Sequence, residues 1–275
     1  GTVVRVSSNP NLRETPFLSP KDTYADGGWD AVKHDAEEKA DLLLSLGINV
    51  NLAPVCDMTS DEYGFMYDRS FSSDVDMENR YVRTVVETSK SKKLGTVLKH
   101  FPGYGNNSDT HTGIAYDDRD YSEFENTDFK PFYQGIESGA DCILVSHNIV
   151  NCMDSEYPAS LSQKVHDILR NEFKFDGVIM TDDLIMDAIT DFTGDEAAAV
   201  TAAKCGNDLL CCSSVDTQYP AVLEAVQNGE ISEAQVDASV KRILKWKQNL
   251  GIFSIDTYQK KVKSTEPTDT VGSEE

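Results

Sequence analysis

Five short runs of apolar residues are spaced along the chain, and each is about as long as a buried β-strand. None of them alternates cleanly between apolar and polar positions, which is the pattern expected of parallel strands that are covered on both faces. The sequence therefore predicts strands at residues 48–54, 96–101, 142–146, 177–181 and 208–212.

Amphipathic segments of helical length lie between these runs. Gly47, Gly95 and Gly139 each stand where such a segment would end, and glycine is a common helix stop. Alternating strands and helices are typical of an α/β fold, and the lack of a dinucleotide-type glycine fingerprint favours a barrel over a Rossmann sheet. The expected helices are Asp30–Leu46, Asp76–Leu94, Phe129–Ser138, Ser162–Phe173, Asp195–Lys204, Gln218–Gln227 and Glu233–Leu250.

Length and composition fit a globular chain with a sizeable core. Of 275 residues, 39% are hydrophobic and 26% are charged, and the polar residues 254–275 are expected to form a tail or linker. With 47 acidic and 25 basic side chains the formal charge is −22, which argues against a nucleic-acid partner because phosphate binding needs clustered Lys and Arg. No apolar run approaches the roughly 20 residues of a membrane span, so no membrane partner is expected.

The six cysteines form no CxxC pair and no cluster with the spacing of zinc ligands. Several stand inside apolar runs, so buried free thiols are a better interpretation than a disulfide framework. We expect neither a metal site nor a cofactor.

Polar residues that can carry chemistry gather just after the predicted strands, where parallel α/β barrels build their active sites. Three of the five histidines are among them, whereas His34 and His166 lie on charged helical segments and are predicted to be solvated. The strand-end residues are Lys99, His100, Asp109 and His111, then Ser146, His147 and Asn148, and finally Asp182 and Asp183.

The loop after the second run carries the pair Asp109-x-His111. A carboxylate close to an imidazole orients the ring and stabilises its protonated form, so this pair is a candidate general acid/base. Taken alone, an Asp that caps a turn in a surface loop explains the pair equally well.

Two adjacent carboxylates, Asp182 and Asp183, end the fourth run. Successive side chains of a strand point to opposite faces, so only one of them can face the barrel mouth and serve as a nucleophile. The other can serve as a helix N-cap. In the loop after the first run, Arg69 could bind hydroxyls or an anion, or form an ordinary surface salt bridge.

Several motifs in a fixed order resemble glycoside hydrolase family 3. They are APV-x-D, RSF-x-SD, KHFPG-x-G, D-x-H and GV-x-x-T-D-x-L-x-M, and the closing KRILKWKQNLGIF is similar to the last helix of the family's barrel. The resemblance spans residues 1–253 and implies a (β/α)8 TIM-barrel-type catalytic domain. The start GTVVRV is similar to the sequence that follows a D-x-E-GG segment in the family, so we expect the chain to lack the first barrel strands.

The D-x-H pair further resembles the family branch that acts on β-N-acetylglucosaminides (NagZ-like). That resemblance implies Asp182 as nucleophile and His111 as acid/base with Asp109 as its partner. It implies retaining hydrolysis through a covalent glycosyl-Asp intermediate.

The resemblance also places Lys99, His100 and Arg69 in the subsite that binds the non-reducing sugar. Tyr104 departs from the branch pattern, which usually has His there. A small carbohydrate is thus the expected substrate, from cell-wall-derived or chitin-type saccharides. The oligomeric state and the compartment are left open.

Four alternatives stay open. The chain could be a β-glucosidase-type member that makes no catalytic use of His111, or an inactive sugar-binding fragment. An anion such as phosphate could replace water, which would give phosphorolysis. A metal-dependent hydrolase would need His100, His111 and Asp182 to converge on one ion.

Overall fold

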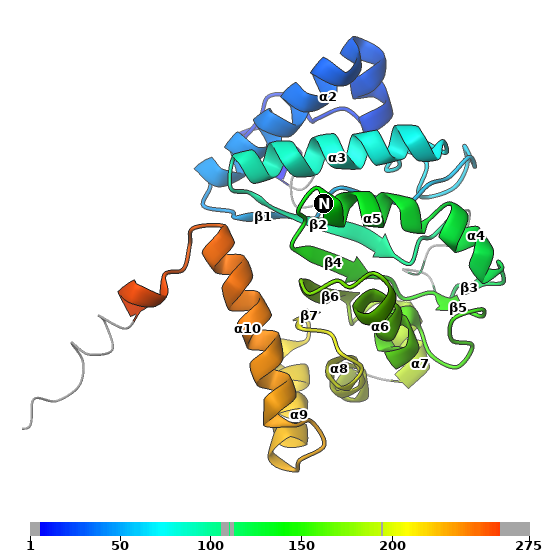
Figure 1. Ribbon diagram of the computed structural model, residues 1–275, viewed down its shortest axis with the longest axis vertical. Helices are drawn as coiled ribbons and strands as arrows, with labels where there is room; N and C mark the ends of the chain where they lie inside the picture. The colour runs from blue at the N-terminus through cyan, green and yellow to red at the C-terminus, as the bar shows by residue number, and fades with distance from the viewer. Residues whose placement is uncertain (1–5, 106–109, 111–112, 194, 259–275) are drawn as a thin grey trace, which may run out of the picture.

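A parallel five-stranded sheet with the order β1-β2-β4-β6-β7 forms the centre of the protein (Figure 1). The computed structural model describes residues 6–105, 110, 113–193 and 195–258. A second sheet in this part of the chain pairs only two short parallel strands, β3 and β5. The strands are β1 (Val50–Asn51), β2 (Gly95–Phe101), β3 (Tyr116–Asp117), β4 (Cys142–Val145), β5 (Ile149–Val150), β6 (Val178–Asp183) and β7 (Leu209–Cys211).

Each of the five apolar runs overlaps one strand of the main sheet, which confirms the predicted α/β architecture. The sheet curls into a half-barrel, in keeping with the expectation of five strands from an eight-stranded barrel. The helices are α2 (Pro20–Ser45), α3 (Val75–Ser91), α4 (Tyr121–Asn126), α5 (Phe129–Glu137), α6 (Gln163–Asp167), α7 (Asp187–Thr193), α8 (Asp195–Lys204), α9 (Val215–Gln227) and α10 (Glu233–Asn249), with a 3-10 turn at Ala159–Leu161 and a π-helical turn at Ile168–Glu172.

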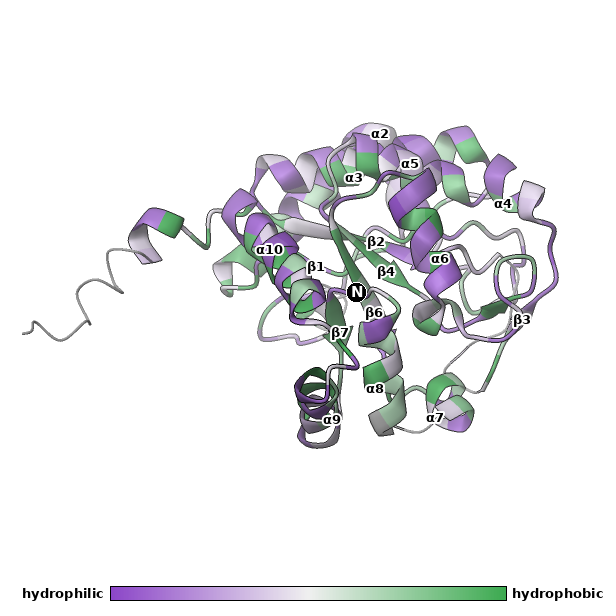
Figure 2. Ribbon diagram, turned by 60° about the horizontal axis from the view of Figure 1, so that its bottom comes forward, coloured by the Kyte–Doolittle hydropathy of each residue, from purple (hydrophilic) through white to green (hydrophobic). Residues whose placement is uncertain are grey.

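Helices cover the outer face of the sheet, and their apolar sides make the largest core. Leu98, Ile143 and Ile179 of three neighbouring strands pack there against α3, α5 and the α6 region. Gly135 of α5 lies so close to β2 that an added Cβ would come within 2.5 Å of the Leu98 side chain. Figure 2 shows the apolar strands beneath helices whose outward sides are hydrophilic.

Helix α10 closes the end of the sheet at which the strands begin (Figure 1). Asn249 donates to Asp141 before β4 at 3.1 Å, and Arg242 pairs with Asp208 before β7 at 3.0 Å. Trp246, from the same helix, packs against Val97 and other apolar residues of the inner face. The opposite end of the sheet, where the strands finish, is the end that carries the predicted chemistry.

The start of α2 and the end of α3 differ from the predicted helix boundaries, because single capping contacts fix them. Helix α2 begins ten residues earlier than expected because Ser19 accepts a hydrogen bond from the Asp22 amide and Pro20 fits the first turn. Its backbone breaks from helical geometry at Gly27 and Gly28. Helix α3 ends at Ser91, and Lys93 rather than Gly95 adopts the left-handed conformation, with φ of 63°.

The prediction that His166 is solvated is wrong. Its side chain is buried with 1% exposure, its Nδ1 lies 2.7 Å from the carbonyl oxygen of Ser162, and Cys205 Sγ lies 4.0 Å from its Nε2. Helix α6 turns this position inward, toward Cys205 and Gly206 in the turn that follows α8. His34 is exposed, as expected.

All six cysteines are free thiols in the described part of the chain. Cys56, Cys142 and Cys205 are buried, whereas Cys152 is exposed. None of the helices within the described ranges is both long and apolar enough to cross a membrane.

Candidate active site

The carboxyl ends of β2 and β6 bring together three of the predicted site residues. His100 Nε2 lies 4.0 Å from Asp182 Oδ2, and Lys99 is close enough to Asp182 to influence the pKa of that carboxyl. The loop after β1 adds Arg69, whose Nη2 lies 3.2 Å from His100 Nε2. Residues from three distant motifs therefore meet at the strand ends, as parallel barrels arrange their sites.

His100 is held at both nitrogens of its ring. Asp57 Oδ2 accepts hydrogen bonds from the His100 amide at 3.0 Å and from Nδ1 at 2.7 Å. A carboxylate only accepts and a guanidinium only donates, so Nδ1 carries the proton and Nε2 accepts from Arg69. His100 is thus neutral in this arrangement, and burial lowers its pKa despite the attraction of Asp57.

Asp57 is a site residue to which the sequence analysis gave no role. It is fully buried, and its second oxygen accepts the backbone amide of Tyr104 at 2.9 Å. Burial works to raise the pKa of Asp57, but the hydrogen bonds from His100 and Tyr104 outweigh it and lower that pKa. The sequence could have indicated Asp57, because it is the last residue of APVCD and comes three residues after the first predicted strand.

Lys99 brings a positive charge to the inner face of β2. Its side chain is only 6% exposed, and burial, with the nearby charge of Arg69, lowers the pKa of Lys99 to about 8. The ammonium is therefore still charged at neutral pH, close to Asp182 and ready to donate hydrogen bonds.

Asp182 and Asp183 point in different directions, as the alternation of a strand predicts. The Asp182 side chain keeps 24% exposure on the side of His100. Burial works to raise the pKa of Asp182, but the neighbouring His100, His147 and Lys99 outweigh it and lower that pKa. Asp183 instead accepts from the amide and hydroxyl of Ser213 after β7. Of these two adjacent carboxylates, Asp182 is the one that faces the strand-end cluster.

His147 fixes the backbone beside the candidate nucleophile. Its ring is fully buried, with Nδ1 2.7 Å from Ser160 Oγ and Nε2 3.0 Å from the carbonyl oxygen of Asp183. A carbonyl oxygen can only accept, so Nε2 carries the proton and Nδ1 accepts from the Ser160 hydroxyl. The sequence placed His147 at a strand end but gave it no role.

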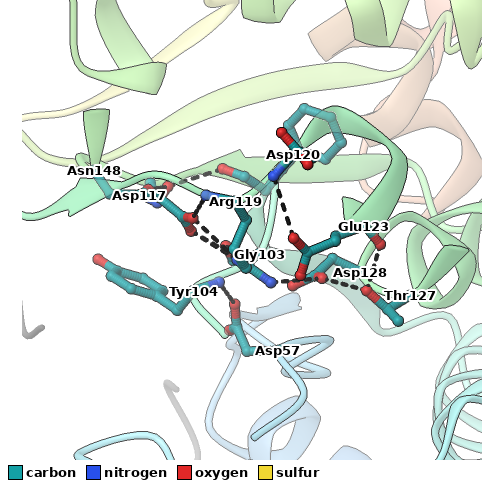
Figure 3. A network of polar contacts seen from close by, with 12 residues as sticks. Asp57, Gly103, Tyr104, Asp117, Arg119, Asp120, Glu123, Thr127, Asp128 and Asn148 are labelled. Carbon is teal, nitrogen blue, oxygen red and sulfur yellow. Dashed lines mark hydrogen bonds and ion pairs between the residues drawn. The ribbon is translucent and has the colours of Figure 1, made fainter. Parts of the chain in front are cut away.

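Arg119 ties the loop after β2 to its surroundings (Figure 3). Its guanidinium donates to Asp117 of β3 at 3.0 Å, to Asp128 before α5 at 2.9 Å and to the Gly103 carbonyl at 3.1 Å. Burial works to lower the pKa of Arg119, but the two carboxylates outweigh it and raise that pKa. The KHFPG turn that carries His100 is therefore fixed to α5 and to the small β3–β5 sheet.

Asp109 and His111, the predicted acid/base pair, lie outside the described residues. Thr110 between them in the sequence is described, and its side chain is fully buried against the Tyr104 hydroxyl. Within the described ranges, no three His, Cys, Asp or Glu side chains are grouped as metal ligands would be.

Comparisons with known proteins agree with this geometry. A protein-family model described as "Glycosyl hydrolase family 3 N terminal domain" matches residues 17–246 of this chain. A β-hexosaminidase of Hydrogenovibrio crunogenus is 34% identical over 199 residues, which cover 70% of this chain and 55% of that protein. The chain spans about half the length of the curated relatives it matches.

Two solved structures share the fold over 86% of this chain. One is a glycoside hydrolase family 3 β-N-acetylglucosaminidase from Paenibacillus, with a TM-score of 0.80, 29% identity and 46% of that chain covered. The other is a β-glucoside phosphorylase, with a TM-score of 0.81, 25% identity and 45% of that chain covered. The family match over most of the chain shows that this protein belongs to glycosyl hydrolase family 3.

Proposed function

We propose that the protein removes β-linked N-acetylglucosamine from cell-wall-derived or chitin-type saccharides by retaining hydrolysis. The observation that carries the proposal is Asp182, an ionised and partly exposed carboxylate next to Lys99 and His100. A nucleophilic carboxylate must be deprotonated and accessible to the substrate, and the lowered pKa and partial exposure of Asp182 support it in that role.

In the proposed reaction, Asp182 attacks the anomeric carbon and forms a glycosyl ester while the leaving oxygen takes a proton from His111. His111 then removes a proton from water, which attacks the ester and releases the sugar with retained configuration. Asp109 orients the imidazole and stabilises its protonated form.

Lys99, Arg69 and His100 bind the sugar in this proposal. Lys99 and Arg69 offer donors that are already held in place, since burial fixes one and the His100 contact fixes the other. Such fixed donors position the ring for in-line attack by Asp182. The names of the β-hexosaminidase and β-N-acetylglucosaminidase relatives support N-acetylglucosamine as the sugar.

The first experiment compares hydrolysis of 4-nitrophenyl β-N-acetylglucosaminide and 4-nitrophenyl β-glucoside. We expect a clear preference for the N-acetylated sugar, and a loss on the order of 10³-fold or more in kcat for Asp182→Asn. Asp183→Asn is the matched control, because it changes the adjacent carboxylate that faces Ser213. Undiminished hydrolysis by Asp182→Asn would show that another group is the nucleophile.

A second candidate reaction is phosphorolysis, which the structural likeness to a β-glucoside phosphorylase makes worth testing. Either water or phosphate can attack the same glycosyl ester. Water releases the free sugar, whereas phosphate releases the sugar 1-phosphate. With phosphate present, we expect free N-acetylglucosamine rather than the sugar 1-phosphate. Accumulation of the sugar 1-phosphate would assign the protein to the phosphorylases.

A further inference from the structure

The turn that carries Arg69 is tied to helix α3 by the side chain of Glu78. Glu78 stands in the first turn of α3 and is fully buried, and its Oε2 accepts a hydrogen bond from the backbone amide of Ser72 at 2.8 Å. Ser72 comes three residues after Arg69, whose guanidinium reaches His100. Glu78 has no part in the proposed reaction, yet it contacts the segment that delivers one of the proposed sugar-binding groups.

Two further contacts hold the same turn. Phe71 stacks on Tyr81, which lies almost one helical turn after Glu78 on α3, with ring centroids 4.7 Å apart. The Ser70 hydroxyl donates to the carbonyl oxygen of Met66 at 3.0 Å. The ring contact fixes a side chain of the turn, whereas the hydrogen bond to Glu78 fixes its backbone.

A fully buried carboxyl lowers the stability of the fold unless its contacts compensate for the lost hydration. Burial raises the pKa of Glu78 well above its usual value, the Ser72 amide opposes this effect, and the charge of Asp57 adds to it. An apolar side chain would avoid the loss of hydration, but it would leave the buried Ser72 amide without this acceptor. The acceptor oxygen is therefore what Glu78 provides and an apolar residue cannot.

We infer that Glu78 is a positioning residue that holds Arg69 in place against His100. By accepting the Ser72 amide, it fixes the backbone three residues from Arg69 and so keeps the guanidinium within hydrogen-bond distance of His100 Nε2. A donor that is already fixed binds a substrate with less loss of conformational freedom. The consequence for sugar binding rests on the proposed function, which assigns Arg69 to the substrate, whereas the contact with His100 does not.

Two substitutions separate the acceptor of Glu78 from its charge and shape. Glu78→Gln keeps an acceptor oxygen and removes the charge, whereas Glu78→Met keeps nearly the same shape and offers only a weakly accepting sulfur. For 4-nitrophenyl β-N-acetylglucosaminide, we expect KM to rise about 10-fold in Glu78→Met and less than about threefold in Glu78→Gln, with kcat changed by less than about threefold in both. Glu87→Met changes an exposed glutamate of α3 and, as the matched control, should leave both constants unchanged.

NMR of the histidine ring nitrogens reports the Arg69 contact in the absence of substrate. His100 Nε2 accepts from Arg69, so its signal should move in Glu78→Met, in the same direction as in Arg69→Ala, and should stay in place in Glu78→Gln. A His100→Gln variant assigns the signal. If Glu78→Met does not fold, Glu78→Asp carries both measurements, because its carboxylate is one methylene too short to reach the Ser72 amide.

The outcomes separate this inference from the proposed function. If Arg69→Ala leaves KM unchanged while Glu78→Met moves the His100 signal, Arg69 does not bind the sugar, but the positioning role of Glu78 stands. If Glu78→Met leaves the His100 signal in place, or if Glu78→Gln and Glu78→Met raise KM equally, the inference is wrong. The double variant of Glu78→Met and Arg69→Ala should have the KM of Arg69→Ala alone, and a further rise would show that Glu78 acts by another route.

Discussion

Replacement of Lys99 by methionine should make the protein more stable and less active. Lys99 is buried on the inner face of β2, where its ammonium group has lost most of its hydration. Methionine has nearly the same length and shape but no charge, so it removes the desolvation penalty without leaving a large cavity. It also removes the donor that we propose for the substrate sugar.

The magnitude follows from the lowered pKa of Lys99. A fall from 10.5 to about 8, at about 1.4 kcal/mol per pH unit, means that the charged form destabilises the folded state by about 3 kcal/mol. The unfolded chain binds this proton more tightly, so the penalty is complete below pH 8 and fades as the pH rises toward 10.5. Lys99→Met should therefore gain up to about 3 kcal/mol at pH 7, and its advantage should narrow toward pH 10.

Urea unfolding at pH 7, 8, 9 and 10, followed by tryptophan fluorescence, measures this difference directly. Lys33→Met, which changes an exposed lysine of α2, is the matched control and should show no such pH-dependent gain. Hydrolysis of the aryl N-acetylglucosaminide by Lys99→Met should fall throughout this pH range. A Lys99→Met variant that is less stable than the wild type at pH 7, or a gain that does not narrow with pH, would refute the reasoning.

Three other substitutions test the supporting contacts. Asp57→Asn removes the carboxylate that orients His100, and kcat/KM should fall about 100-fold with the fold intact by circular dichroism. Arg119→Leu leaves Asp117 and Asp128 buried without a counter-charge, so chemical denaturation should show a loss of about 3–5 kcal/mol. Gly135→Ala forces a methyl group against Leu98 and should cost about 1–3 kcal/mol, and it should cost less when it is made in a Leu98→Ala background.

The strands of the sheet could be predicted because the pattern that indicates each strand lies within a few consecutive residues. Each strand of the main sheet lies in a short segment rich in apolar residues, and the composition of that segment indicates a strand without any knowledge of its neighbours. Helix ends were harder, because they depend on single contacts such as the Ser19 cap of α2 and the left-handed Lys93 after α3. The burial of His166 could not be predicted, since it depends on how α6 meets Cys205 and Gly206 in the turn after α8.

The site residues also fall into those that the sequence could place and those that it could not. Lys99, His100 and Asp182 could be placed from sequence because chemistry at the ends of parallel strands converges whatever the details of packing. Asp57 and Arg119 were not given roles, because an acidic or basic residue in a loop has a solvated alternative until its buried partners are known. Their contribution is visible only in the contacts to His100 and to the Gly103 carbonyl.

The charge balance at the site shows why His100 must be neutral. Arg69 donates to His100 Nε2, so a proton on that nitrogen would replace an attractive contact by a repulsive one, close to a second cation at Lys99. Asp57 compensates one positive charge at most, and in the proposed reaction Asp182 is needed for the sugar. Burial therefore lowers the pKa of His100, and any fall in activity that its protonation causes should come at a more acidic pH than for an ordinary histidine.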